Sequence, residues 1–322
     1  MKKFWSRTGI LLLCVWLLSV SVSATQMLIP VGQVVGLELG DNSVTVAAFD
    51  EKLGPAAQKA GLKVGDRIMK VNSKVIHNTE DIRYALDHSD GMVELTVLRN
   101  KKTDTIRFSP AITQDGPKLG VYLKQGVTGI GTVTWYDPDS GKFGTLGHGV
   151  NNTKGELLKM VSGNAYKASI VSVKKGVCGT PGQLIGTLTD AKPMGTLYKN
   201  CTRGIFGTTP TGWTGNAMPV GSDDDVRIGP AVIRSTVQGD TVREYSVEIL
   251  KVYPDADSTG RNILLKITDQ ALLDATGGIV QGMSGSPIIQ DGKLVGAVTH
   301  VLVNDPTTGY GIFIENMLDA AA

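Results

Sequence analysis

Glycine constrains the fold of this chain more than any other residue type does. The 322 residues include 40 glycines, against about 23 at an average usage of roughly 7%. No G-X-Y period accompanies the excess, which excludes collagen, and stretches rich in valine, isoleucine and threonine separate the glycines. Because β-branched residues favour strands and glycine favours tight turns, we expect a mostly β protein with many short strands.

Length and charge limit the number of domains and the classes of partner. At about 150 residues per domain, the chain has room for two domains. The 32 lysines and arginines nearly balance the 30 aspartates and glutamates, which leaves a formal net charge of +2. No segment is basic enough to follow a phosphate backbone, so we do not expect nucleic acid as a partner.

The first 25 residues have the layout of an export signal. Lys2, Lys3 and Arg7 precede an apolar stretch at residues 9–20, and small residues follow as far as Ala24. The apolar stretch is shorter than the roughly 20 residues that span a bilayer, which favours cleavage over a retained anchor. We therefore expect an extracytoplasmic protein, either secreted or anchored in the membrane.

Two cysteines, Cys178 and Cys201, lie beyond this segment. Export allows them to form a disulfide, but the bond requires a Cα separation that the sequence does not give, so pairing and two free thiols both stay open. No cluster of cysteine and histidine has the spacing of a zinc site, and we expect neither a metal nor an organic cofactor.

Residues 54–76, GPAAQKAGLKVGDRIMKVNSKVI, form the most informative motif of the first half. They resemble a PDZ domain of the kind found in exported bacterial proteases, and we assign residues 26–112 to this PDZ-like α/β module. A PDZ domain adds an extended peptide to a free sheet edge, and backbone amides of a preceding loop receive the terminal carboxylate. A segment of the protein's own chain is the alternative ligand. The resemblance implies a carboxylate-binding loop and an edge strand that contain Ile29, Pro30, Val31, Gly32, Gln33, Val35 and Leu37.

The remaining chain, residues 118–322, follows a polar joint at residues 113–117. Its short strand candidates are separated by glycine-rich turns, without the alternation of strands and helices that indicates a parallel sheet. The pattern predicts an all-β barrel or sandwich after the PDZ-like module.

The motif Gly282-Met283-Ser284-Gly285-Ser286-Pro287 lies near the carboxyl end. Glycines around a serine allow a sharp turn that exposes the hydroxyl and directs nearby N–H groups at one point, as an oxyanion site requires. The motif resembles the nucleophile loop of chymotrypsin-like serine peptidases. That resemblance implies a double β-barrel, Ser284 as the nucleophile, and the N–H groups of Gly282 and Ser284 as oxyanion donors. Ser286 is the competing nucleophile.

A serine nucleophile needs a base within hydrogen-bond reach. His148 ends a strand candidate between two glycines, far before Ser284 in the chain, as expected when two barrels each contribute to one site. His300 is a weaker candidate because it ends a strand shortly after Ser284, and a place in the wall of the site suits it better. His77 and His88 belong to the PDZ-like module and are expected at its surface.

The base in turn needs an acceptor that fixes its tautomer. Asp269 opens the connection from a strand candidate into the serine motif, and we predict that it is this acceptor. Its alternative role is to cap a helical turn, in which Asp274 is the nearest competing carboxylate.

The order of the motifs is similar to that of the SpoIVB family of serine peptidases. The resemblance rests on the PDZ motif, Gly147-His148-Gly149, Lys266-Ile267-Thr268-Asp269, the serine motif and Gly296-Ala297-Val298-Thr299-His300-Val301. It implies a triad of His148, Asp269 and Ser284. It also implies a sporulation signalling protease, exported into the space between the forespore membranes, that cleaves itself and a membrane-bound regulator. Cleavage of that regulator releases an intramembrane metalloprotease, which activates a late sigma factor.

Two other functions stay open at this point. One is a scaffold without catalytic activity that acts through the PDZ groove. The other is a hydrolase of small esters that uses a dyad with Ser286 or His300.

Overall fold

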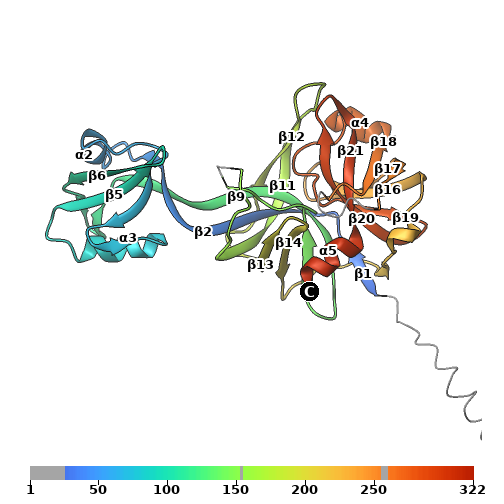
Figure 1. Ribbon diagram of the computed structural model, residues 1–322, viewed down its shortest axis with the longest axis horizontal. Helices are drawn as coiled ribbons and strands as arrows, with labels where there is room; N and C mark the ends of the chain where they lie inside the picture. The colour runs from blue at the N-terminus through green and yellow to red at the C-terminus, as the bar shows by residue number, and fades with distance from the viewer. Residues whose placement is uncertain (1–25, 153–154, 255–259) are drawn as a thin grey trace, which may run out of the picture.

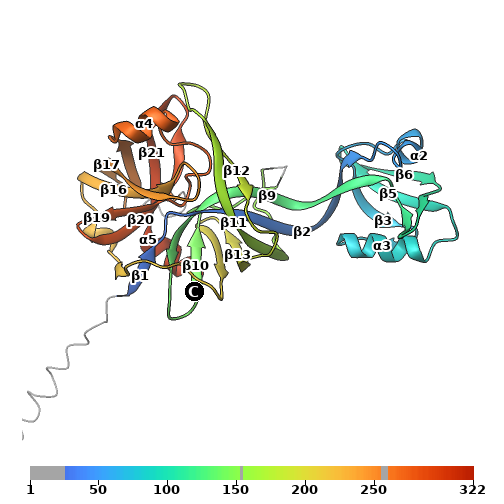
Figure 2. The same ribbon diagram turned by 180° about the vertical axis from the view of Figure 1, so that it is seen from behind.

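The computed structural model describes residues 26–152, 155–254 and 260–322. The predicted export signal at residues 1–25 lies outside the described residues. Two β-barrels lie side by side, and a smaller domain lies at the far end of a two-stranded arm (Figure 1), as the view from behind also shows (Figure 2).

The first barrel consists of β9 (Val121–Tyr136), β10 (Lys142–Thr145), β14 (Gly204–Thr208), β13 (Gly195–Cys201), β11 (Ser162–Lys174) and β2 (Val34–Phe49). Each strand pairs with the next in that order. The last strand, β2, also pairs with the first, β9, so the sheet closes. The core contains the fully buried Val133, Phe143 and Ile205. Three shorter strands extend this sheet, namely β1 (Met27–Pro30) beside β9, β15 (Met218–Pro219) beside β1, and β12 (Gln183–Leu188) beside β11.

The small domain is inserted between β2 and β9. It contains α2 (Pro55–Lys59), β3 (Arg67–Val71), β4 (Lys74–Val75), α3 (Thr79–Asp87), β5 (Val93–Arg99), β6 (Lys102–Phe108), β7 (Ala111–Thr113) and β8 (Gly116–Lys118). Asn78 begins α3, because its side chain accepts a hydrogen bond from the backbone N–H of Asp81. The ends of β2 and β9 belong to this domain, whose core includes Val44, Val46 and Leu119.

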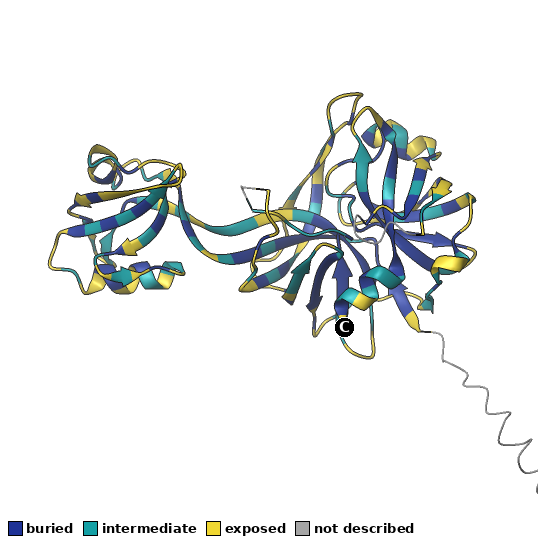
Figure 3. Ribbon diagram, in the orientation of Figure 1, coloured by how far each residue is buried: buried dark blue, intermediate teal, exposed yellow. Residues whose placement is uncertain are grey.

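The second barrel is closed by β16 (Gly229–Thr236), β17 (Val242–Val252), β18 (Ile263–Ile267), β21 (Asp305–Phe313), β20 (Lys293–Leu302) and β19 (Pro287–Gln290). In β17, Tyr245, Val247 and Ile249 are buried while their neighbours are exposed, which is the period of two expected for a strand with one inward face. Buried residues line the interiors of both barrels (Figure 3). The short η1 (Asp223–Asp225), α4 (Gln270–Thr276) and α5 (Ile314–Ala321) lie outside the strands. The predicted mostly β fold with a double barrel is confirmed.

The structure corrects the predicted domain boundaries of 26–112 and 118–322. β1 and residues 34–39 of β2 belong to the first barrel, because they pair with β9 and β11 rather than with the small domain. The peptidase part therefore begins before the PDZ-like domain and resumes after it. A strand pattern shows which residues lie in a sheet, but it does not show which strands are their neighbours.

The prediction of a peptide-binding loop and edge strand at residues 29–37 is also wrong, because this segment belongs to the first barrel. β11 pairs with one side of Val35–Leu39 and β9 pairs with the other side, so this segment has no free edge. The loop Ile29–Gln33 joins the two barrels instead. The Pro30 carbonyl accepts a hydrogen bond from Arg234 of β16, and the Gly32 carbonyl accepts one from Thr236 of the same strand.

Candidate active site

The serine motif forms a loop whose backbone is fixed against β9 of the first barrel. Thr132 donates from its N–H to the Ser284 carbonyl at 3.0 Å and from its hydroxyl to the Gly282 carbonyl at 2.8 Å. Thr134 donates from its hydroxyl to the Gly285 carbonyl at 2.8 Å. Gly285 has φ +95°, and a Cβ there would lie 2.0 Å from the Thr132 carbonyl oxygen. Only glycine fits this close approach between the two barrels.

The two serines of the motif have different surroundings. Ser284 is partly exposed, and its Oγ donates to the Thr299 carbonyl at 2.9 Å. Ser286 is fully buried, and its Oγ donates to the Ser235 hydroxyl at 3.1 Å inside the second barrel. A substrate reaches the first hydroxyl and not the second, so the dyad with Ser286 has no structural support.

The two proposed oxyanion donors are oriented by the carbonyls that precede them. The Gln281 carbonyl accepts from the N–H of Leu184 in β12 at 2.8 Å, and the Met283 carbonyl accepts from the N–H of Ser286 at 3.0 Å. In a trans peptide the C=O and N–H point in opposite directions, so the N–H groups of Gly282 and Ser284 point away from these partners. Neither N–H donates a hydrogen bond within the part of the chain that the structure describes. Both are therefore available to a ligand oxygen.

His148 follows β10 on a turn in which Leu146 and Gly147 both have positive φ, 69° and 67°. Its Nδ1 lies 3.0 Å from the Gly149 carbonyl oxygen. Because a carbonyl only accepts, this contact places the proton on Nδ1 and leaves Nε2 as an acceptor. Burial lowers the pKa of His148 below its ordinary value of 6.5, with a smaller opposing effect from the Gly149 carbonyl. The imidazole is therefore neutral at neutral pH, as a general base requires.

His300 lies beside His148, with the two ring centroids 5.3 Å apart and the planes tilted by 40°. A β-bulge lies at Thr299 in β20, where the Thr299 carbonyl accepts from Ser284, and the next residue, His300, lies against His148. Burial, then the charges of His148 and Arg261, lower the pKa of His300 to about 4. His148 and Ser284 thus contact consecutive residues of one strand, although no hydrogen bond joins them directly within the described residues.

Asp269 occupies the alternative role that the sequence left open. Its carboxylate accepts from the Leu272 N–H at 2.9 Å and caps α4, and its own N–H donates to the Ser246 carbonyl. Within the described residues no hydrogen bond or ion pair joins Asp269 to His148. The competing Asp274 is bonded to Gln270 on the same helix.

The small domain has a free strand edge that the sequence analysis missed. Residues 121–125 of β9 pair with β2 on one side only, and the groove between this edge and α3 encloses about 380 Å³. Its lining includes Ile82, Leu86, Leu119 and Leu123. Gly120 precedes the edge with φ +72°, where a Cβ would lie 2.2 Å from the Leu53 carbonyl oxygen. A glycine directly before an apolar strand was the available signal, but those residues adjoin the segment that we assigned to a polar joint.

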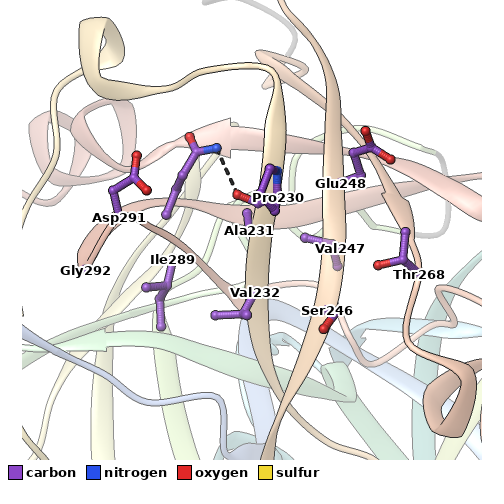
Figure 4. Close-up of a pocket in the computed structure, with 11 residues that line it drawn as sticks. Pro230, Ala231, Val232, Ser246, Val247, Glu248, Thr268, Ile289, Asp291 and Gly292 are labelled. Atoms are coloured by element: carbon purple, nitrogen blue, oxygen red, sulfur yellow. Dashed lines mark hydrogen bonds between the residues drawn. The ribbon is translucent and has the colours of Figure 1, made fainter.

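A separate pocket of about 470 Å³ lies on the outer wall of the second barrel, between β16, β17 and β19 (Figure 4). Glu248 and Asp291 lie among its lining residues. The Gln290 side chain is already bonded to the carbonyls of Pro230 and Arg227. Neither His148 nor Ser284 lines this pocket.

The cysteines and potential metal ligands form neither a disulfide nor a metal site among the described residues. Cys178 is exposed and Cys201 is half-buried, and both are free thiols, so the disulfide alternative is not realised. In residues 26–152, 155–254 and 260–322, no three side chains of the metal-binding types are placed to share an ion. Among the described helices, none has the length and apolarity to cross a bilayer.

Comparison with known proteins identifies both parts of the chain. The family described as SpoIVB peptidase S55 matches residues 115–318, and the PDZ domain family matches residues 51–99, which confirms both resemblances. The crystal structure of Rv3671c protease, inactive form, is similar at 14% identity and a TM-score of 0.34, covering 60% of this chain and 82% of that chain. The inactive serine-to-alanine mutant of Rv3671c from M. tuberculosis H37Rv is similar at 14% identity and a TM-score of 0.32, covering 61% and 82%. No curated protein sequence matches the chain.

Proposed function

The chain belongs to the SpoIVB peptidase S55 family and is a serine peptidase, and on this premise we propose that Ser284 is its nucleophile and His148 its base. One observation carries the proposal. The accessible Ser284 hydroxyl lies on a loop in which two backbone N–H groups donate no hydrogen bond within the described residues. This hydroxyl contacts the Thr299 carbonyl, and the next residue, His300, lies against His148.

The proposed reaction starts when the Ser284 hydroxyl leaves the Thr299 carbonyl. His148 Nε2 takes its proton while Oγ forms a bond to the carbonyl carbon of the substrate, and the N–H groups of Gly282 and Ser284 stabilise the resulting oxyanion. His148 then donates the proton to the departing amine, which leaves an acyl-enzyme. Water, deprotonated by the same imidazole, releases the acid and restores Ser284.

Asp269 is the proposed third member of the triad, on the strength of its position in the family motif. In this structure the Gly149 carbonyl already accepts the hydrogen bond from His148 Nδ1. A triad role predicts that Asp269→Asn lowers the rate of reaction by about 10⁴-fold while Asp274→Asn does not. A helix cap alone predicts little change in stability, because asparagine caps a helix about as well as aspartate, and it predicts that the rate is preserved; that result would remove Asp269 from the proposal.

The proposed substrate and compartment follow from the family resemblance. We propose an endopeptidase of sporulation signalling in the space between the forespore membranes, which cleaves itself and a membrane-bound regulator of an intramembrane metalloprotease. The free edge of β9 supports recognition of an extended peptide, either from the substrate or from the protein itself. Mapping of the new peptide ends after incubation with such a regulator in membranes tests this assignment.

A fluorophosphonate probe tests the peptidase proposal directly. The wild type should form a covalent adduct at Ser284, and Ser284→Ala should not. Ser286→Ala is the matched control, because it removes the neighbouring buried hydroxyl and should still label. If neither wild type nor control labels, the protein is instead a peptide-binding scaffold that acts through its PDZ groove.

A further inference from the structure

Thr132 connects the two sides of the candidate active site. Its N–H and hydroxyl donate to the carbonyls of Ser284 and Gly282, at 3.0 and 2.8 Å. Its own carbonyl accepts from the hydroxyl of Thr145, at 2.6 Å, in the last position of β10 before the turn that carries His148. The Thr132 residue is completely buried. One residue of β9 therefore touches the backbone of the nucleophile loop and the strand that leads to the base.

The hydroxyl of Thr132 holds the peptide group that lies between the two oxyanion donors. The carbonyls of Gln281 and Met283 are held by backbone N–H groups, whereas the Gly282 carbonyl is held by this side chain. Gly282 has φ +101°, and a glycine has few steric barriers to rotation. On the other side of the same peptide group, the N–H of Met283 donates to the Val280 carbonyl at 3.1 Å. A change of ψ at Gly282 that shifts its carbonyl turns the two donor amides relative to each other, because this peptide group lies between them.

We propose that Thr132 is a positioning residue whose hydroxyl keeps the N–H groups of Gly282 and Ser284 convergent on one oxygen. The inference rests on the proposed function of Ser284 and deepens it. Thr132 touches no reacting atom. It acts through the Gly282 carbonyl, so the loss of its hydroxyl changes the stabilisation of the oxyanion and not the binding of the substrate.

Thr132→Val removes this hydrogen bond with little change in shape and keeps the backbone bonds to Ser284 and Thr145. We expect the maximal rate of fluorophosphonate labelling, kinact, to fall by about tenfold to a hundredfold, below the roughly 10²–10³-fold cost of deleting one oxyanion donor. The half-saturating probe concentration, KI, should stay within about twofold. Thr132→Ser, which restores the hydroxyl, should recover most of kinact.

Thr236→Val is the matched control. Thr236 is also completely buried in a strand, and its hydroxyl donates at 3.1 Å to the carbonyl of Gly32, a residue outside the serine motif. Each valine variant leaves one carbonyl without its side-chain partner, half-buried at Gly282 and buried at Gly32, so we expect the control to lose at least as much thermal stability as Thr132→Val. Only Thr132→Val should lose kinact.

Three results would overturn the inference. The first is wild-type kinact in Thr132→Val, and the second is a loss of kinact in both valine variants in proportion to their stability. The third is failure of Thr132→Ser to recover the rate although it folds. A wild type that does not label at all is distinguishable from these, because it overturns the proposed function and this inference together.

Discussion

The nucleophile loop and the groove edge of the PDZ domain both offer backbone N–H groups to a ligand, but their surroundings differ. Every carbonyl from Gln281 to Gly285 accepts a hydrogen bond from the protein. At the groove, residues 121–125 of β9 are paired on one side and open on the other. The hydrogen bonds of the loop are formed without a ligand, whereas the open edge of β9 has no strand partner on its second side among the described residues.

The difference follows from what each region is proposed to bind. The oxyanion forms only during the reaction, so its donors must already point at one place, because reorganisation during the reaction would add to the barrier. A peptide strand brings its own donors and acceptors, and an open edge of regular geometry is sufficient. The two regions lie on one continuous strand, since β9 forms the groove edge at its start and contacts the nucleophile loop at Thr132.

Among the changes that compare the loop with the groove, the largest expected effect comes from a Cβ in the rigid loop. Gly285→Ala should lower fluorophosphonate labelling at least a hundredfold, because the new atom would lie 2.0 Å from the Thr132 carbonyl oxygen and displace the loop. Gly292→Ala is the control, since Gly292 has a similar positive φ of 75° with no atom within 4 Å of its Cβ. The control should lose about 1–2 kcal/mol of stability and keep its labelling rate. Equal rates in the two variants would show that the loop is not rigid.

A smaller effect is expected at the groove. Leu123→Ala should weaken binding of a fluorescent peptide, selected from a library with free carboxyl ends, by about fivefold to tenfold through lost apolar contact. Tyr84→Ala is the control, because Tyr84 is exposed on α3 and does not line the groove. Fluorescence anisotropy measures both affinities. Unchanged affinity in Leu123→Ala would place the peptide site elsewhere.

The same comparison explains how much of the molecule the sequence predicts. Ser284, its flanking glycines and His148 were recognisable as candidates because the proposed chemistry requires those residue types in short local motifs. The mostly β fold was recognisable because strand and turn propensities are local too. The segment at residues 34–39 was assigned to the wrong domain, because its apolar pattern is identical whether its neighbours are β9 and β11 or the strands of a PDZ domain.

Long-range contacts account for the rest. The surroundings of His148 depend on His300 of the second barrel, and the hydroxyl of Thr132 meets the Gly282 carbonyl across the two barrels. Nothing in a short stretch around Thr132 distinguishes it from the other threonines of a β-rich chain. Asp269 shows the opposite case, because its place before a helical turn indicated the cap as the alternative to the predicted triad role, and the structure shows that cap.

The smallest expected effect separates the two regions by pH. Burial lowers the pKa of His148 below 6.5, so the proposed base is mostly neutral at pH 6.5. Labelling should decline only at lower pH, with a midpoint under 6.5, as the imidazole gains its proton. His300, with a pKa of about 4, is neutral at pH 6.5.

The groove should not respond over the same range. Hydrogen bonds from the backbone of Leu53 and Lys52 lower the pKa of Asp50, a lining residue, below 3.8, so its charge is constant between pH 5 and 7. Peptide affinity measured by anisotropy should therefore stay level where the labelling rate falls. A labelling midpoint above 6.5 would mean that His148 is stabilised in its charged form, as a carboxylate partner would do. That result would favour a contact between Asp269 and His148.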